Sequence, residues 1–348
     1  MKDATGSSPD IHEIDATPET VNWGFFDNST QPACRIKSGD IVRIETVTHQ
    51  AGDAPDYLMD PGIKDIYESI SSEERGPGVH IMTGPIHVEG ASPGDVIECR
   101  ILDFEPRIPY GVNLSANWGL LYDEFDQQEY VTVYEINEKA STVEAVFQYE
   151  YPGTYDEIGP WVDPDTVDRT SVLDDVSIPI NYHFGTAGVA PAESGKIDSV
   201  PPGVYGGNVD NRHFNIGTSM YYPVQVEGGL FVAGDSHITQ GDGEASGTAV
   251  EASLNALVQF FVHTDLDFDS PVLETSTHWV THGFNEDLEV AAQDAGVEMI
   301  DLLCRKWEFT RPSAYSLLST ASDFHVTQFV NGTKGIHCML NKNVVPSE

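Results

Sequence analysis

Basic residues are scarce in this 348-residue chain, which has 17 Lys and Arg against 56 Asp and Glu, a formal net charge of -39. Phosphate backbones and anionic membrane surfaces repel such a chain, so we expect neither a nucleic-acid nor a membrane partner. The acidic residues are spread along the sequence rather than collected in a tail. This spread predicts a protein adapted to a salt-rich cytoplasm, where molar salt shortens the Debye length to about 3 Å and screens self-repulsion. The alternative is an ordinary acidic protein without a salt requirement.

Long apolar runs are missing too. The richest apolar stretch, residues 256–262, is interrupted by Gln259, and no run approaches the roughly 18 residues of a membrane span. The N-terminal residues lack the apolar segment of a secretion signal. The sequence therefore predicts a soluble, cytoplasmic protein.

Cysteine is rare, and the four cysteines lie far apart, at Cys34, Cys99, Cys304 and Cys338. A disulfide framework needs a small secreted chain, and a thiolate metal site needs closely spaced pairs, so neither is expected. The chain also lacks the G-x-S-x-G, P-loop and G-x-G-x-x-G motifs. Serine-hydrolase, NTPase and dinucleotide-binding functions therefore have no support.

The residues that are present predict a mainly β fold, a sandwich or open barrel, with helices gathered in the C-terminal third, α+β overall. Alternating apolar and polar residues after Gly-Asp turns are typical of half-buried strands. Such strands are expected at residues 41–47, 96–102, 129–136 and 142–149, with a C-terminal hairpin over residues 324–340. Apolar residues at helical spacing predict helices over residues 246–263, over residues 285–307, and from Pro312 onward.

The domain prediction is a flexible N-terminus, residues 1–11, followed by one catalytic unit over residues 12–348. Within that unit we expect a β part over about residues 12–200 and a part with polar loops and helices over about residues 201–348.

Potential ligand side chains are densest in two Gly-rich segments, residues 206–212 and 234–244. Between them we expect a hairpin of two strands joined at Glu227-Gly228, which would bring Asp210 next to Asp235 and His237. Carboxylates and an imidazole among glycines are suited to a divalent cation. The alternative is a set of Asx turns that binds no ion.

A second candidate is His80, in the strand-like segment of residues 79–90. An isolated histidine in a strand is also commonly a packed, hydrogen-bonded residue, and both interpretations stay open. No role is assigned from spacing to the histidines at His49, His183, His213, His263, His278, His282, His325 and His337.

Together these segments resemble the acetamidase/formamidase family over nearly the whole chain, from about residue 12 to residue 336. The matching motifs occur in the family's order, at residues 80–95 (H-x-M-T-G-P-I-x-V-E-G-A-x-P-G-D), 206–212 (G-G-N-x-D-x-R), 223–224, 234–237 (G-D-x-H), 240–244 (Q-G-D-G-E), 248–251, 314–319 and 328–331. Gly229 departs from a common Ala, and Ala245-Ser246 stands where many members carry Val followed by Cys or Ser.

The resemblance implies an amidase that hydrolyses short aliphatic amides to carboxylate and ammonia, with bound Zn²⁺ and possible additional Ca²⁺. A homodimer is expected by analogy with the fold. Mapping the chemistry onto this chain, we expect metal-activated water with these residues: metal ligands His80, Asp210, Asp235 and His237; catalytic groups Glu244, Asp242 and Gln240; and substrate contacts Asn208, Thr83 and Ser246. Glu251 is expected to orient a ligand.

Two alternatives stay open at this point. One is a non-catalytic metal- or carbohydrate-binding β-sandwich that uses the same loops. The other is a hydrolase for a different C–N bond, such as that of a carbamate.

Overall fold

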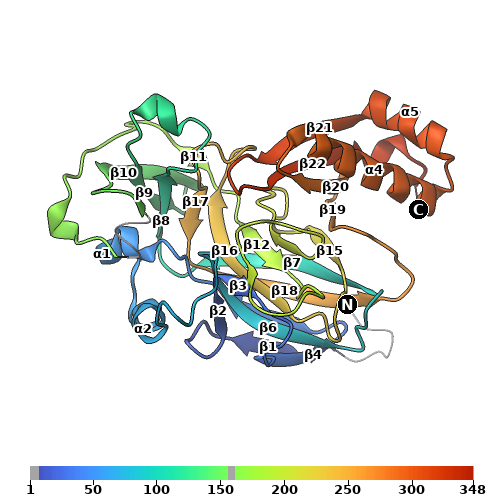
Figure 1. The fold of residues 1–348 in the computed structure, drawn as a ribbon, viewed down its shortest axis with the longest axis horizontal. Helices are drawn as coiled ribbons and strands as arrows, with labels where there is room; N and C mark the ends of the chain where they lie inside the picture. The colour runs from blue at the N-terminus through green and yellow to red at the C-terminus, as the bar shows by residue number, and fades with distance from the viewer. Residues whose placement is uncertain (1–7, 156–160, 348) are drawn as a thin grey trace.

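A computed structural model describes residues 8–155 and 161–347 of the chain. Within these ranges the strands form two large sheets, of nine and eleven strands, and one two-stranded sheet of β3 (Phe25–Phe26) and β13 (Ile197–Asp198) (Figure 1). The nine-stranded sheet has the order β1 (Ile11–Ile14), β5 (Ile41–Glu45), β18 (Leu254–His263), β7 (Val96–Pro106), β15 (Ser219–Pro223), β19 (Val272–Glu274), β20 (His278–Asn285), β22 (Lys334–Asn341), β21 (Ser322–Gln328).

The eleven-stranded sheet carries most of the polar residues discussed below. Its main path is β11 (Ile178–Pro179), β10 (Thr142–Glu150), β9 (Tyr130–Asn137), β8 (Tyr110–Ser115), β17 (Val250–Ala252), β16 (Phe231–Thr239), β12 (His183–Gly188), β14 (Gly206–Asn208). Strand β6 (Ile81–Glu89) pairs with β16 and also with β2 (Val21–Trp23) and β4 (Cys34–Lys37). Each large sheet therefore contains strands from both before and after residue 200.

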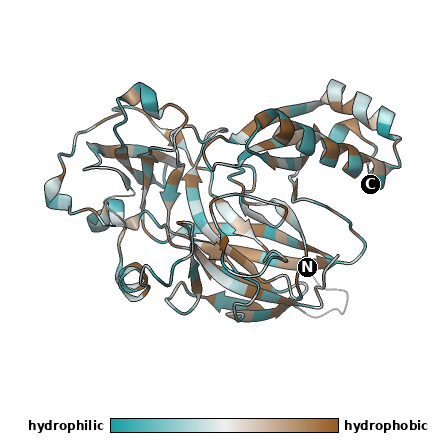
Figure 2. Cartoon of the chain, in the orientation of Figure 1, coloured by the Kyte–Doolittle hydropathy of each residue, from teal (hydrophilic) through white to brown (hydrophobic). Residues whose placement is uncertain are grey.

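The core lies between the two large sheets. Val42, Ile44 and Val258 from the nine-stranded sheet and Phe184 and Phe231 from the eleven-stranded sheet are almost fully buried members of one apolar cluster. Apolar residues concentrate in the strands, whereas the peripheral loops are mostly hydrophilic (Figure 2). The predicted mainly β, sandwich-like α+β fold is confirmed.

The helices predicted near the C-terminus are confirmed as α4 (Leu288–Trp307) and α5 (Arg311–Ala321). Asp287 and Thr310 cap them, since each side chain accepts a hydrogen bond from a first-turn amide. Helix α4 packs on β20 and β22, so this part of the chain forms a separate layer at one end of the molecule (Figure 1). Two shorter helices, α1 (Pro55–Leu58) and α2 (Pro61–Ser69), lie at the opposite side (Figure 1).

The helix predicted over residues 246–263 is wrong, because this segment forms strands β17 and β18. Leu254, Ala256, Val258 and Phe260 are at most 1% exposed, and they follow the period of two that a strand requires. The apolar residues of this segment are so closely spaced that they match both the helical period of 3.6 and the strand period of two. Pairing of β18 with β5 and β7 decides in favour of the strand.

The hairpin predicted over residues 220–233 is also wrong. Strand β15 pairs with β7 and β19, whereas β16 pairs with β6, β12 and β17 in the other sheet. Gly228 and Gly229, with φ of 75° and 67°, carry the chain from one sheet to the other. The two polar segments nevertheless meet, because β12 lies between β14 and β16 and pairs with both.

Of the N-terminal segment predicted to be flexible, residues 1–7 lie outside the described ranges. The adjoining residues are attached to the nine-stranded sheet: Ile11 pairs with Ile41, and the Ile41 amide donates a hydrogen bond to the Asp10 carbonyl. No helix in the described part of the chain is long and apolar enough to cross a membrane.

The acidity of the chain makes its stability depend on pH at one partly buried position on α4. Burial and the nearby carboxylates of Asp269, Asp301 and Asp294 raise the pKa of Glu298 to about 7. The folded chain then holds the Glu298 proton more tightly than the unfolded chain does. The contribution of Glu298 to the free energy of unfolding therefore falls as pH rises from about 4.5 to about 7. Glu298→Gln stays neutral, and we expect it to be more stable than the wild type at pH 8 by up to about 1 kcal/mol, after allowance for solvent screening.

Urea unfolding of the wild type and Glu298→Gln at pH 5 and pH 8, at fixed salt, measures this effect. The difference in the free energy of unfolding should be close to zero at pH 5. An equal difference at both values would show that packing, not charge, is responsible.

Candidate active site

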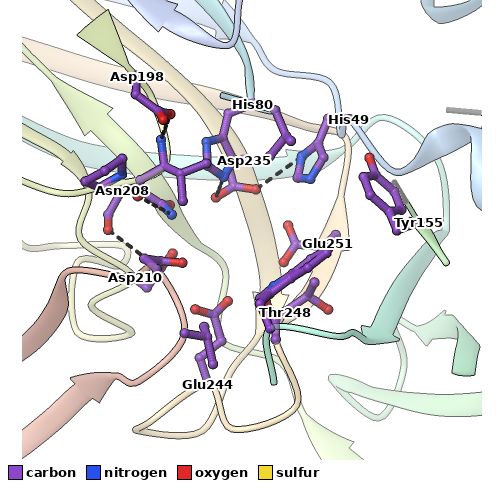
Figure 3. A pocket seen from close by; sticks show the side chains of 18 residues that line it. His49, His80, Tyr155, Asp198, Asn208, Asp210, Asp235, Glu244, Thr248 and Glu251 are labelled. Carbon is purple, nitrogen blue, oxygen red and sulfur yellow. Dashed lines mark hydrogen bonds and ion pairs between the residues drawn. The ribbon is translucent and has the colours of Figure 1, made fainter. Parts of the chain in front are cut away.

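A cavity of about 430 Å³ opens where β16, β17 and several loops meet, and it contains most of the polar residues singled out above. Figure 3 shows the side chains that point into it. The lining is His49, Val79, His80, Trp118, Tyr155, Asp198, Val200, Pro201, Asn208, Asp210, Asp235, Glu244, Gly247, Thr248, Glu251, Val330, Asn331 and Gly332.

Strand β16 supplies the centre of the site. All nine residues of β16 are buried, and Asp235 and His237, two positions apart, lie on the same face of the strand. His237 is the direct cross-strand partner of His183 on β12 and of Glu251 on β17. Side chains of such partners lie on one face about 5 Å apart, so the pairing itself gathers these polar groups.

Ligand atoms form three overlapping groups, each with its atoms within 4.8 Å of one another. They are His49, His80 and Asp235; Asp235, His237 and Glu251; and Asp210, His237 and Glu244. All these residues are buried, and Asp235 and His237 each belong to two groups. The three groups therefore make one continuous centre of three imidazoles and four carboxylates.

The contacts between Asp235 and the three imidazoles are too long for good hydrogen bonds. One carboxylate oxygen lies 3.6 Å from His49 Nδ1, and the other lies 3.6 Å from His80 Nε2 (Figure 3). The second oxygen also lies 3.6 Å from His237 Nε2. His237 Nε2 also lies 3.2 Å from Glu251 Oε2, without the geometry of a hydrogen bond.

Four buried atoms of this centre have no hydrogen-bond partner: His49 Nδ1, Asp210 Oδ1, His237 Nε2 and Glu251 Oε2. Buried polar atoms without partners are costly and rare. Imidazole nitrogen and carboxylate oxygen are also the atoms that zinc and other borderline divalent cations prefer. The residues present thus fit a bound divalent cation.

Surrounding hydrogen bonds fix the imidazoles. His80 Nδ1 lies 2.9 Å from Ser199 Oγ, and His237 Nδ1 lies 3.0 Å from Gln240 Oε1. Because Nδ1 of each ring is engaged in this way, Nε2 faces the carboxylates. Gly185 leaves room for this arrangement, since a Cβ there would lie 2.4 Å from the His237 ring and 2.7 Å from Asp235 Oδ2.

The proton affinities of the carboxylates differ sharply. Burial, followed by the negative charge of Asp210, raises the pKa of Glu244 well above its usual value. Burial likewise raises the pKa of Glu251, to about 8, although His237 opposes the shift. Burial acts on Asp235 in the same sense, but the imidazoles of His80, His237 and His49 outweigh it and hold the pKa of Asp235 well below its usual value. The low pKa of Asp235 therefore favours its ionised form, whereas the raised pKa of Glu244 favours its protonated form.

Three carboxylates of the cavity share an unusual backbone conformation. Asp210, Asp235 and Glu244 have φ of 54°, 50° and 48°, in the left-handed region that non-glycine residues rarely occupy. Asn331 helps to hold the first of them, because its side-chain amide donates a 2.6 Å hydrogen bond to Asp210 Oδ2. Such strained residues cluster at functional sites.

The expected metal ligands His80, Asp210, Asp235 and His237 all belong to this centre, and Glu244 lines the same cavity. Asn208 also lines it, but its Oδ1 accepts from Thr186 and its Nδ2 donates to the Val200 carbonyl. Gln240 lies behind His237 and donates to the Asp210 carbonyl, so it supports the centre rather than facing the cavity.

The remaining expected residues do not line the cavity. Thr83 is fully buried on β6, and Ser246 borders a separate hollow, where its hydroxyl accepts a hydrogen bond from Asn113. Its hydrogen-bond partners among the described residues, the Asn113 side-chain amide and the Thr248 carbonyl, are not the base that a nucleophilic serine needs. Asp242 is exposed, and its carboxylate lies 3.7 Å from His325.

Sequence reasoning missed His49, which follows β5, and gave Glu251 only a supporting role. His49 reaches the centre through tertiary folding, with no spacing signal in the sequence. The Glu251 contact depends on the β16–β17 pairing, which a predicted helix over residues 246–263 conceals.

Fold and cavity together define a mainly β protein with a buried centre of imidazoles and carboxylates, in which burial raises the pKa of Glu244 and Glu251. The sequence profile of the Acetamidase/Formamidase family matches residues 19–197 and 192–341. The chain belongs to this family, and it is an amidase, as its sequence predicts.

Two characterised relatives have the family's activities in their names. An acetamidase of Mycolicibacterium smegmatis is 27% identical over 83% of this chain and 82% of its own length. A formamidase of Methylophilus methylotrophus is 26% identical over 60% of this chain and 56% of its own length.

Solved structures share the fold. An acetamidase from Bacillus halodurans has a TM-score of 0.75 and 27% identity, covering 95% of this chain and 98% of its own. A predicted acetamidase/formamidase from Thermoanaerobacter tengcongensis has a TM-score of 0.78 at 24% identity, covering 97% of both chains. A γ-lactamase from Delftia acidovorans is more distant, with a TM-score of 0.55 and 19% identity over 95% of this chain and 90% of its own.

Proposed function

We propose that this amidase hydrolyses short aliphatic amides of the formamide and acetamide type with the help of a divalent cation, with Zn²⁺ as the first candidate and Ca²⁺ as an additional one. The observation that carries the proposal is the convergence of three imidazoles and four carboxylates in one buried centre beside the cavity, with four of their atoms lacking hydrogen-bond partners. A site that needed only hydrogen bonds would leave no such set unpaired.

His80, Asp210, Asp235 and His237 are the proposed ligands, as expected from the sequence, and the geometry adds His49 and Glu251 as candidates. A divalent cation bound there supplies Lewis-acid polarisation of the amide carbonyl and lowers the pKa of water from about 15.7 to about 7.

The chain's own residues supply the proton chemistry. Amide nitrogen is a poor leaving group until it is protonated, and Glu244 is a buried carboxyl group with a raised pKa, facing the cavity. We assign to Glu244 the delivery of a proton to the departing ammonia, a step worth about 10²–10⁴-fold in rate. Because Gln240 and Ser199 hold His237 and His80 in place, the imidazoles need no reorganisation during the reaction.

The size of the cavity supports a second candidate substrate class. About 430 Å³ is within the range of pockets that enclose drug-sized ligands, and acetamide has only four heavy atoms. Val79, Trp118, Val200 and Val330 give part of the wall an apolar character. A larger amide or a carbamate would therefore also fit, with its apolar group against this wall.

Ammonia release from formamide, acetamide, propionamide and a larger aromatic amide, measured in concentrated KCl, tests the proposal. Chelation should abolish turnover, and zinc should restore it. Full activity after thorough metal removal would overturn the cation's role, and a preference for the aromatic amide would favour the second substrate class. Size-exclusion chromatography over a KCl series tests the predicted homodimer and salt adaptation in the same preparation.

A further inference from the structure

A second group of potential ligand atoms lies outside the cavity lining. It consists of His213, which follows β14, Asp242, which follows β16, and His337, on β22. One nitrogen or oxygen from each residue lies within 4.8 Å of the other two. Sequence reasoning assigned Asp242 to catalysis, but the fold directs it to this group instead.

His337 is the most constrained member of the group. Its side chain is fully buried, Nδ1 lies 2.8 Å from Thr327 Oγ1, and Nε2 has no hydrogen-bond partner. His213 Nε2 is buried and unpartnered as well, and the two rings meet edge to face with centroids 5.5 Å apart.

A third histidine flanks the group from β21. His325 stacks on His337 with centroids 5.2 Å apart, and its Nδ1 lies 3.7 Å from Asp242 Oδ2. Asp242 and His325 are partly exposed, so this side of the group is open to solvent and provides a path of entry. The opposite side is closed by the buried His337.

We propose that His213, Asp242 and His337 bind a second divalent transition-metal ion of the zinc class, with His325 positioned as a fourth ligand. Four imidazole and carboxylate donors match the tetrahedral coordination of Zn²⁺. Ca²⁺ and Mg²⁺ are disfavoured, because they require six or more ligands that are mainly oxygen. The exposed Asp242 side chain can move the short distance needed to complete the coordination.

An ion at this position would connect the C-terminal layer to the active site. His337 belongs to β22, and Asp242 precedes Glu244 by two residues. The intervening Gly243 already exchanges backbone hydrogen bonds with β21 and the residue after it, through the Thr327 carbonyl and the Phe329 amide. The second ion would fasten the same turn through side chains, and so hold Glu244 against the cavity.

Zinc and cobalt binding to the full-length protein tests this proposal. After dialysis against buffered zinc, Asp242→Asn and His213→Gln should each bind one equivalent less than the wild type, which corresponds to an affinity at least about tenfold weaker. His278→Gln changes a histidine on β20 outside both groups and should bind as the wild type does. Elemental analysis gives the number of ions, and visible absorption after Co²⁺ substitution reports coordination by the protein.

The second site is tested separately from the proposed catalytic one by including Asp235→Asn. Asp235→Asn should still bind the metal ion at the second site, which Asp242→Asn loses. If Asp242→Asn and His213→Gln bind as much metal as the wild type, or if Asp235→Asn removes all bound metal, the second site does not exist. Circular dichroism confirms that each variant is folded, and the exposed Asp242 is the substitution least able to disturb the fold.

Discussion

Asp235→Asn should abolish amide hydrolysis, lowering kcat/KM by at least about a thousandfold, the equivalent of about 4 kcal/mol of lost transition-state stabilisation. The Asp235 carboxylate faces His49, His80 and His237 at 3.6 Å, and its pKa is held low by these imidazoles. Asparagine keeps the size and, like aspartate, tolerates the left-handed backbone, but it removes the negative charge. The expected cause of inactivity is therefore loss of the catalytic cation rather than misfolding.

Asp175→Asn is the matched control, because Asp175 also has a left-handed backbone, with φ of 64°, but is exposed and outside the cavity lining. Metal content, circular dichroism and ammonia release are measured on both variants. If Asp235→Asn retains kcat/KM within tenfold of the wild type, the central role of Asp235 is wrong.

Glu244→Gln should lower kcat by about 10²–10⁴-fold while leaving the bound metal in place. Burial and the charge of Asp210 raise the pKa of Glu244, which favours the protonated form that can donate. Activity that requires this protonated form falls as pH rises through the pKa. Glutamine occupies the same space without a transferable proton, so the variant's residual rate should lose this alkaline decline.

Glu308→Gln provides the control for this substitution, since Glu308 shares the left-handed conformation, with φ of 56°, at the end of α4 and away from the cavity. The pH profile of kcat and the metal content of each protein are compared. Full turnover by Glu244→Gln would reassign the proton transfer, with Glu251 as the next position to test.

The sequence predicts helices and strands well where the apolar residues follow only one of the two periods, that of a helix or that of a strand. Helix α4 has an apolar stripe at helical spacing, and the C-terminal hairpin combines two alternating strands with an Asn331-Gly332 turn. It fails over residues 254–263, where nearly continuous apolar residues fit a helix and a strand equally well. Only the neighbouring strands β5 and β7 decide between the two, and such long-range pairing is not visible in local spacing.

For the site, too, local spacing predicts some residues, and long-range pairing brings in the others. Asp210, Asp235 and His237 meet as predicted, although through β12 and not through the expected hairpin. His49 and Glu251 are brought in from distant segments by tertiary folding and cross-strand pairing. Asp242 shows the opposite limit: only Gly243 separates it from Glu244 in the sequence, yet its side chain belongs to a different group.

The left-handed backbone shared by Asp210, Asp235 and Glu244 has an evolutionary consequence. Each position combines an unfavourable φ with a buried acidic group. Neutral residues that accept this conformation, such as asparagine or glycine, would therefore raise the stability of the fold and at the same time abolish activity. Directed evolution for heat resistance alone would therefore enrich inactive descendants at these three positions. Any stabilisation campaign on this protein needs a turnover screen in every round.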